Sequence, residues 1–271
     1  MKSICNFWRM LIPLGCMLGI LATSDPIQAE SLTVGATHTL KAAFEEIIPL
    51  FEREYGATVD VVYAPSKTLR RQIEKRAPID VFLPGSVDEV MKLQKKGLVL
   101  GDYRVYAQTS LVLVMPTNSP ATPISFREGP PNRVTRIAVG DPQTSGLGDI
   151  TAKALTQVDP AYMSRSHFVQ APHSHDIVDL VRSGAADVGL LYRVDAINSA
   201  QMRIIDEIPA GSHTSVQFGQ AILSTCRSES LRVAERFLDY MMSARVQKLL
   251  LKYGFDAAHI TTSPMAQLIR E

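Results

Sequence analysis

Residues 61–86 form the stretch that most constrains what this chain can fold into. β-Branched and aromatic residues at 59–63 are typical of a short strand, and the apolar spacing of 67–75 is typical of a helix. Residues 79–83 are again apolar and follow a proline that ends the helix. This order predicts a strand, a helix and a second strand, with Ser66 at the N-terminus of the helix.

A helix N-terminus that faces the end of a strand can hold an anion without a positively charged side chain. Ser66 would add a hydroxyl donor to the free N–H groups of the first helical turn. An ordinary helix cap has the same sequence pattern, so that alternative stays open at this point.

Further polar positions follow predicted strands in the same way. They are Thr39 after the strand 32–36, the loop 144–148 after the strand 136–142, Ser174 after the strand 167–171, and Tyr192 at the end of the strand 188–192. Ligands of open α/β sheets bind at the carboxyl ends of strands, so these positions predict one shared anion site. Purely structural roles, as helix caps, a flexible loop or a core tyrosine, are the alternatives.

Strands alternate with helices along the chain, which predicts an α/β fold with mostly parallel sheets flanked by helices. Two strongly apolar strands, 111–115 and 220–223, would be the crossings between two lobes, with the ligand in the cleft between them. The expected organisation is a first part of lobe I at 30–112, lobe II at 113–217, and a return to lobe I with C-terminal helices at 218–271.

Residues 1–29 are expected to be a signal peptide that is cleaved during export, which would make the mature protein periplasmic. Lys2 and Arg9 form a basic start, and the apolar run 10–23 is short for a membrane span. The residues around Cys16 are similar to a lipoprotein signal but fit that pattern poorly.

Charge and cysteine content narrow the classes of function. The chain has 28 Lys and Arg against 27 Asp and Glu, a net charge of +1, which argues against nucleic-acid or membrane-surface binding. Without the signal peptide, Cys226 is the only cysteine, so an internal disulfide and a cysteine-based metal site are excluded. An enzyme is not expected either, because no motif frames a nucleophile with a base.

Five segments stand in an order and spacing that can be compared with known families. They are Leu32–Leu40, Thr68–Glu74 with Ala77–Phe82, Ala138–Pro142, Val188–Tyr192 and Lys252–Phe255. Together they resemble the periplasmic molybdate-binding proteins of bacterial ABC importers, within the type II solute-binding family. The resemblance extends over nearly the whole mature chain and implies the two-lobed type II periplasmic binding protein fold.

The resemblance also implies a ligand, which is molybdate or tungstate, and the residues that hold it. These are the hydroxyls of Thr39, Ser66 and Tyr192 and the backbone N–H groups of Leu147 and Ser174. It implies no cofactor, no protein-ligated metal, a monomer, and the membrane permease of an ABC importer as partner. A tetrahedral dianion only accepts hydrogen bonds, so hydroxyl and amide donors can satisfy it completely.

Some residues beside the implied donors depart from the family's pattern: His38, Lys67, His173 and His175. We expect at least one imidazole near the cleft and an affinity that depends on pH. The alternatives left open are a receptor for a phosphonate, sulfate or small organic anion, and a metal-binding receptor that uses the histidines.

Overall fold

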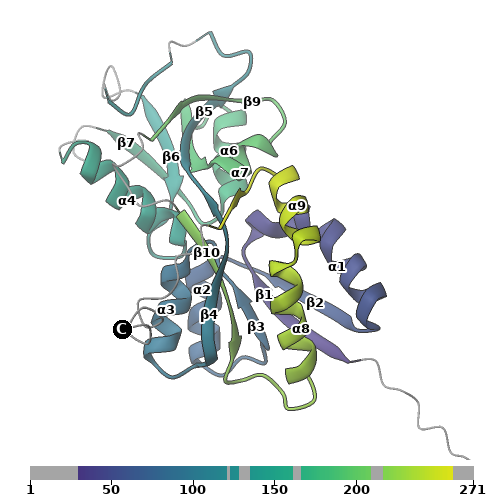
Figure 1. Cartoon of the computed structure of the whole chain (residues 1–271). Helices are drawn as coiled ribbons and strands as arrows, with labels where there is room; N and C mark the ends of the chain where they lie inside the picture. The colour runs from purple at the N-terminus through teal and green to yellow at the C-terminus, as the bar shows by residue number, and fades with distance from the viewer. Residues whose placement is uncertain (1–29, 121–122, 128–134, 161–165, 209–215, 259–271) are drawn as a thin grey trace, which may run out of the picture.

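The computed structural model describes residues 30–120, 123–127, 135–160, 166–208 and 216–258. In this part of the chain two mixed sheets, each covered by helices, form two lobes, one above the other in Figure 1. The predicted signal peptide lies outside the described residues. Within these ranges, no helix is both long and apolar enough to cross a membrane.

The first lobe contains a six-stranded sheet in the order β11-β4-β10-β3-β1-β2. Its strands are β1 (Ser31–Ala36), β2 (Thr58–Tyr63), β3 (Val81–Leu83), β4 (Val99–Thr109), β10 (Val216–Leu223) and β11 (Asp256–Ala257). Its helices are the 3-10 helix η1 (His38–Leu40), α1 (Lys41–Tyr55), α2 (Ser66–Glu74), α3 (Val87–Lys95), α8 (Leu231–Met242) and α9 (Ala244–Lys252).

The helix α1 shows how the apolar spacing builds the core of this lobe. Phe44, Ile47 and Phe51 fall on one buried face, and Gly56 ends the helix with a φ of 65°. Phe44 and Phe51 meet Phe237 of α8 edge to face, with ring centroids 6.2 and 5.1 Å apart. A helix near the start of the chain is thereby packed against one near its end.

The second lobe contains a five-stranded sheet in the order β7-β6-β8-β5-β9. Its strands are β5 (Leu111–Pro116), β6 (Arg136–Gly140), β7 (His167–Ala171), β8 (Val188–Tyr192) and β9 (Met202–Glu207). Its helices are α4 (Gly146–Val158), α6 (Ser174–Arg182) and α7 (Arg193–Ile197).

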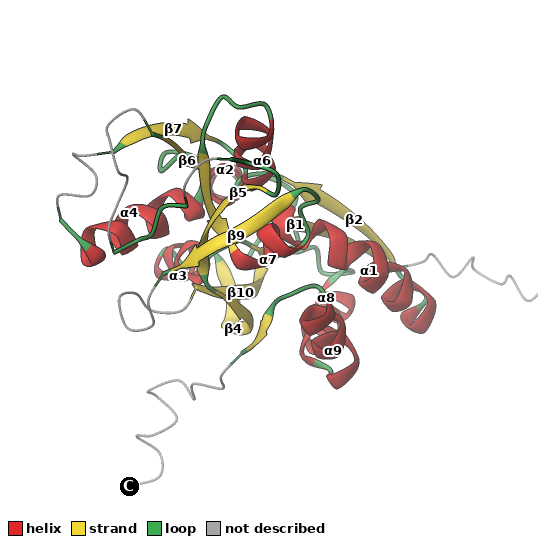
Figure 2. Ribbon diagram, turned by 90° about the horizontal axis from the view of Figure 1, so that it is seen from above, coloured by secondary structure: helices red, strands yellow, loops and turns green. Residues whose placement is uncertain are grey.

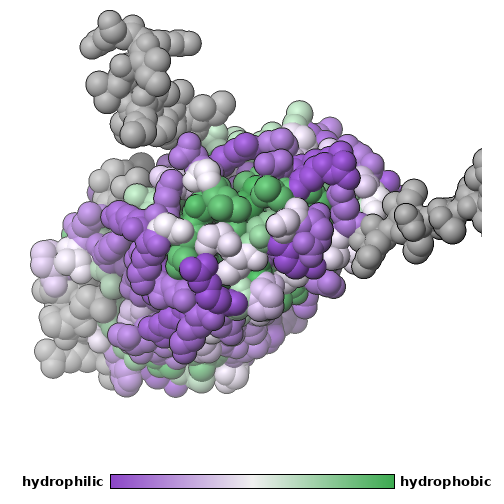
Figure 3. Space-filling view, turned by 90° about the horizontal axis from the view of Figure 1, so that it is seen from below, coloured by the Kyte–Doolittle hydropathy of each residue, from purple (hydrophilic) through white to green (hydrophobic). Residues whose placement is uncertain are grey.

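Seen from above, helices of the whole molecule lie on both sides of the strands (Figure 2). Seen from below, the surface is mostly hydrophilic around one apolar region (Figure 3).

The sheets are mixed, so the prediction of mostly parallel sheets is wrong. β1 runs parallel to β2 and β3, and β6 runs parallel to β7 and β8. The pairs of β10 with β3 and β4, and of β5 with β8 and β9, are antiparallel. β4 is absent from the sequence prediction because Gly101, Asp102 and Arg104 interrupt its apolar pattern.

The chain leaves the first lobe at Ser110, between β4 and β5, and returns in β10. The two apolar strands that were expected to cross between the lobes each belong to one sheet only, as β5 and β10. The range 113–217 expected for lobe II begins inside β5 and ends inside β10. Because β10 inserts between β4 and β3, the first sheet is assembled from two distant parts of the chain.

Candidate functional site

A small cavity of about 20 Å³ lies where loops of the two lobes meet. The ends of β1, β2 and β3 form one side of it, and the ends of β6, β7 and β8 form the other. The described residues that line it are Thr37, His38, Ala64, Pro65, Ser66, Gly85, Ser145, Leu147, Pro172, His173, Ser174 and Tyr192. Among the predicted donors, Ser66, Leu147, Ser174 and Tyr192 are thus brought together, and Thr39 is not part of the wall.

Gly85 stands at the centre of this site. Its N–H donates to Ser66 Oγ at 2.9 Å, and its carbonyl oxygen accepts from the Tyr192 hydroxyl at 2.7 Å. A Cβ at this position would lie 3.3 Å from Thr37 Oγ1 and 3.4 Å from the Tyr192 ring. A glycine therefore lets the hydroxyl-bearing side chains close around the backbone.

Ser66 occupies a different place in its helix from the one predicted. The structure places Pro65 at the N-cap position, and Ser66 is the first residue of α2. Its buried hydroxyl does not cap the helix and instead accepts the hydrogen bond from Gly85. Because a hydroxyl accepts and donates at once, the proton of Ser66 is free to point into the cavity.

The helices α4 and α6 of the second lobe begin at the cavity. Ser145 caps α4, and its Oγ accepts from the Leu147 N–H at 3.1 Å. The backbone N–H of His173, just before α6, donates to Asp176 Oδ2 at 3.1 Å. The partial positive charge of two helix N-termini therefore faces the cavity, although the Leu147 N–H is already engaged.

Thr37, rather than Thr39, supplies the hydroxyl at the end of β1. Thr39 lies in the 3-10 helix that follows, and its Oγ1 donates to Asp195 Oδ2 at 3.1 Å. The two threonine oxygens are 3.5 Å apart, so Thr39 stands behind Thr37 as seen from the cavity. Thr37 therefore lines the small cavity and Thr39 lines a neighbouring one, and a role of Thr39 as an anion donor stays a prediction.

Three imidazole rings from both lobes meet beside the cavity. The ring centroid of His38 lies 4.5 Å from that of His173 and 5.1 Å from that of His175. Burial, with the neighbouring histidines, lowers the pKa of His38 to about 4, and burial also lowers the pKa of His173. His38 and His173 line the cavity as neutral rings near pH 7, while His175 lies outside its wall.

Lys67 does not face the cavity. Its Nζ donates to the carbonyl oxygen of Pro142 at 2.5 Å and forms an ion pair with Asp149 Oδ2 at 2.7 Å. Both partners belong to the second lobe, so this cation joins the lobes. It does not stand beside a bound anion as an unpaired charge.

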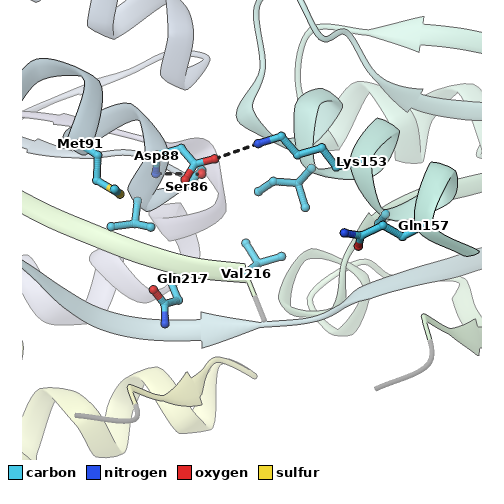
Figure 4. A pocket seen from close by; sticks show the side chains of 10 residues that line it. Ser86, Asp88, Met91, Lys153, Gln157, Val216 and Gln217 are labelled. Carbon is cyan, nitrogen blue, oxygen red and sulfur yellow. Dashed lines mark hydrogen bonds and ion pairs between the residues drawn. The ribbon is translucent and has the colours of Figure 1, made fainter. Parts of the chain in front are cut away.

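Two larger cavities flank the small one. One of about 330 Å³ lies between α3, α4 and β10, and its lining includes Met91, Gln157, Val216 and Gln217 (Figure 4). An ion pair of 3.3 Å between Lys153 and Asp88 spans it. The other, of about 310 Å³, includes Thr39, His175 and Asp195 in its wall. Within the part of the chain that the structure describes, no group of three or more His, Cys, Asp or Glu side chains could hold a metal ion.

The sequence analysis missed Thr37, Gly85 and Asp195 and named Ser145 only as part of a loop. Thr37 directly follows β1, and Gly85 lies two residues after the end of β3, which was the available signal. Ser145 lies within the predicted loop 144–148. Asp195 had no signal, because its partner Thr39 is 156 positions away.

Residues 32–256 match the family described as bacterial extracellular solute-binding protein. YvgL of Bacillus subtilis, named as a candidate substrate-binding lipoprotein of an ABC transporter, is 26% identical over 94% of this chain and 96% of its own length. The molybdate-binding protein ModA of Escherichia coli is 27% identical over 89% of this chain and 95% of its own. A more distant relative, the aconitate isomerase of a Pseudomonas species, is 22% identical over 90% of this chain and 95% of its own length.

Among solved structures, the periplasmic molybdate-binding protein of Azotobacter vinelandii is similar with a TM-score of 0.70 and 21% identity. The match covers 84% of this chain and 100% of that one. This likeness confirms the predicted two-lobed fold of type II periplasmic binding proteins. Because the family match extends over most of the sequence, the chain belongs to the family of bacterial extracellular solute-binding proteins.

Proposed function

We propose that this protein captures a small tetrahedral oxyanion, molybdate or tungstate, and delivers it to the membrane permease of an ABC importer. The observation that carries the proposal is the chemistry of the small cavity. Its described wall combines hydroxyls and helix N-termini from both lobes, and no Asp, Glu, Lys or Arg is among those residues. The relatives named as molybdate-binding proteins support this choice of anion.

Such a wall suits an anion that carries only acceptor oxygens. Thr37, Ser66 and Tyr192 offer hydroxyl protons, and the first turns of α4 and α6 offer N–H groups. Each charge-assisted hydrogen bond contributes roughly 1.5–3 kcal/mol net, so several together reach micromolar or tighter binding. A carboxylate in the wall would oppose such binding by like-charge repulsion.

Hydrogen bonds already formed in the cavity wall imply that the wall rearranges when the anion enters. On binding, the Tyr192 hydroxyl would exchange the carbonyl oxygen of Gly85 for an anion oxygen. The Leu147 N–H would exchange Ser145 Oγ in the same way. Capture then accompanies a hinge motion of the two lobes.

The sequence and the family support a setting for this function. We infer that residues 1–29 direct export and are removed, and that the mature chain works in the periplasm as a monomer. Its partners would be the oxyanion and the permease of the importer.

The test is a calorimetric titration of the purified mature protein, with melting temperatures measured in parallel. Molybdate and tungstate are expected to bind and to raise the melting temperature. At a free ligand concentration of one hundred times Kd, binding adds about 2.7 kcal/mol to the free energy of unfolding. Sulfate, phosphate, methylphosphonate, trans-aconitate and Zn²⁺ serve as competitors from the alternative classes. If one of these binds and neither molybdate nor tungstate does, the proposed ligand is wrong.

A further inference from the structure

Asp195 is a partly buried carboxylate that stands behind the small cavity. It lies on α7, which begins directly after Tyr192. Its Oδ2 accepts from Thr39 Oγ1 at 3.1 Å, and the side chain of Ser174 also donates to the carboxylate. Thr39 belongs to the first lobe, and Ser174 and Asp195 belong to the second. The carboxylate therefore joins the two lobes through hydroxyl groups.

The single proton of a hydroxyl group decides what this arrangement presents to the cavity. An ionised Asp195 can only accept, so Thr39 directs its proton to the carboxylate. Thr37 Oγ1, 3.5 Å from Thr39 Oγ1, then directs its own proton toward the lone pairs of Thr39. The hydroxyl of Thr37 then has only oxygen lone pairs, and no proton, to present to the cavity. A bound oxyanion needs a donor at that place.

The charge of Asp195 is also unfavourable for an anion nearby. The titratable and charged groups around it are His38, Lys41 and Glu45 of the first lobe and Tyr192 and His175 of the second, and Asp176 acts on His38. Burial raises the pKa of Asp195 to about 6, against the hydrogen bonds from Ser174 and Thr39 and the charge of His175, which lower it. This carboxyl group therefore gains or loses its proton near neutral pH.

We propose that the protein takes up one proton with each oxyanion and holds that proton on Asp195. The proton comes from solvent and binds to Asp195 Oδ2, which then donates to Thr39. Thr39 then donates to Thr37, and Thr37 donates to the anion. The two hydrogen bonds that link Asp195, Thr39 and Thr37 thereby reverse their direction. The inference rests on the proposed function, because it requires an oxyanion in the small cavity.

Proton uptake makes the affinity depend on pH. The bound anion raises the pKa of Asp195 above its value of about 6 in the free protein, because two negative charges repel. The affinity then increases as the pH falls through the bound-state pKa, and it becomes constant below the free-state pKa. The increase is about tenfold for each unit by which the anion raises this pKa.

The test is calorimetric titration with molybdate, tungstate and sulfate between about pH 5.5 and about pH 8.5, in buffers of different ionisation enthalpy. For the wild type we expect net proton uptake on anion binding, with its maximum between the free-state and bound-state pKa values of Asp195. We also expect an affinity at least about tenfold weaker at the alkaline end. Asp195→Asn keeps the shape and removes the charge. Its affinity should be the same at all of these pH values and exceed that of the wild type at alkaline pH.

Glu45→Gln is the matched control, because Glu45 is an exposed carboxylate on the wall of the same 310 Å³ cavity. It should keep the pH dependence of the wild type. A flat wild-type profile, or a profile that persists in Asp195→Asn and disappears in His38→Gln, would overturn the inference. An anion that binds without proton uptake overturns the inference alone, whereas the absence of binding by all three anions overturns the proposed function as well.

Discussion

Tyr192 of the second lobe donates a hydrogen bond to the carbonyl oxygen of Gly85 in the first lobe, with 2.7 Å between the two oxygens. The N–H of the same glycine donates to Ser66 Oγ. Gly85 is thus held by two side chains that we propose bind the anion. Closure of the lobes and completion of the site therefore depend on the same few atoms.

Replacing Tyr192 by phenylalanine is expected to weaken molybdate binding by about 1–3 kcal/mol, which is the cost of one missing donor in a closed site. Calorimetric titration measures the loss. Tyr106→Phe is the matched control, because the Tyr106 hydroxyl is buried and has no hydrogen-bond partner among the described residues. Equal affinities for wild type and Tyr192→Phe would show that this hydroxyl does not contact the ligand.

The hydroxyl at the end of β1 can be assigned by comparing two threonines. Thr37→Val is expected to weaken binding, because it removes a hydroxyl from the wall of the cavity. Thr39→Ser should be nearly neutral, since it keeps the donor to Asp195. Ser66→Ala should weaken binding as Thr37→Val does. It also leaves the buried Gly85 N–H without its acceptor, which costs about 1–3 kcal/mol of stability. If Thr37→Val binds like the wild type, Thr37 is not a ligand residue.

The ion pair of Lys67 and Asp149 is expected to stabilise the closed arrangement of the lobes. The side chain of Lys67 is 12% exposed, and the pair lies at 2.7 Å. A double-mutant cycle with Lys67→Met and Asp149→Asn should give a coupling of about 1 kcal/mol in anion binding. A more exposed inter-lobe pair, Lys153 and Asp88, has side chains that are 69% and 45% exposed and should give about zero. Equal coupling energies for the two pairs would contradict the expectation that the less exposed pair contributes more.

Acid should destabilise the free protein through His38. Its pKa is about 4 in the folded protein, against 6.5 for an unperturbed histidine, so the unfolded chain binds more protons between these values. The free energy of unfolding therefore decreases as the pH falls through this window. His38→Gln should reduce that decrease, measured by urea unfolding at several pH values. Asp195→Asn should enlarge it, because the raised pKa of Asp195 contributes with the opposite sign.

The positions of Ser66 and Tyr192 were predictable from the sequence, because a strand end and a following turn are local signals. The place of Thr37 in the cavity wall was not, because it depends on one turn of 3-10 helix after β1. The pairing of Lys67 with Asp149 was equally hidden, since it forms only when the two lobes meet.

The direction of the strands was not predictable from the sequence. Alternating strands and helices indicate an α/β class, but periodicity carries no information about strand direction. The strands β4 and β10 pair antiparallel over most of their length, and β4 has too many polar residues to be recognised alone. A long strand of this kind can be recognised only when the strand that pairs with it is known.

The place of β10 between β4 and β3 has a consequence for the order in which the molecule can be built. A chain that emerges with its N-terminus first presents β1, β2 and β3 long before β10 is available to join them to β4. The strands of the second lobe come from one continuous segment, so its sheet can form without a later part of the chain. The lobe that begins the chain is therefore the last to be completed. Until then the loops that carry Thr37, Ser66 and Gly85 have no finished sheet beneath them.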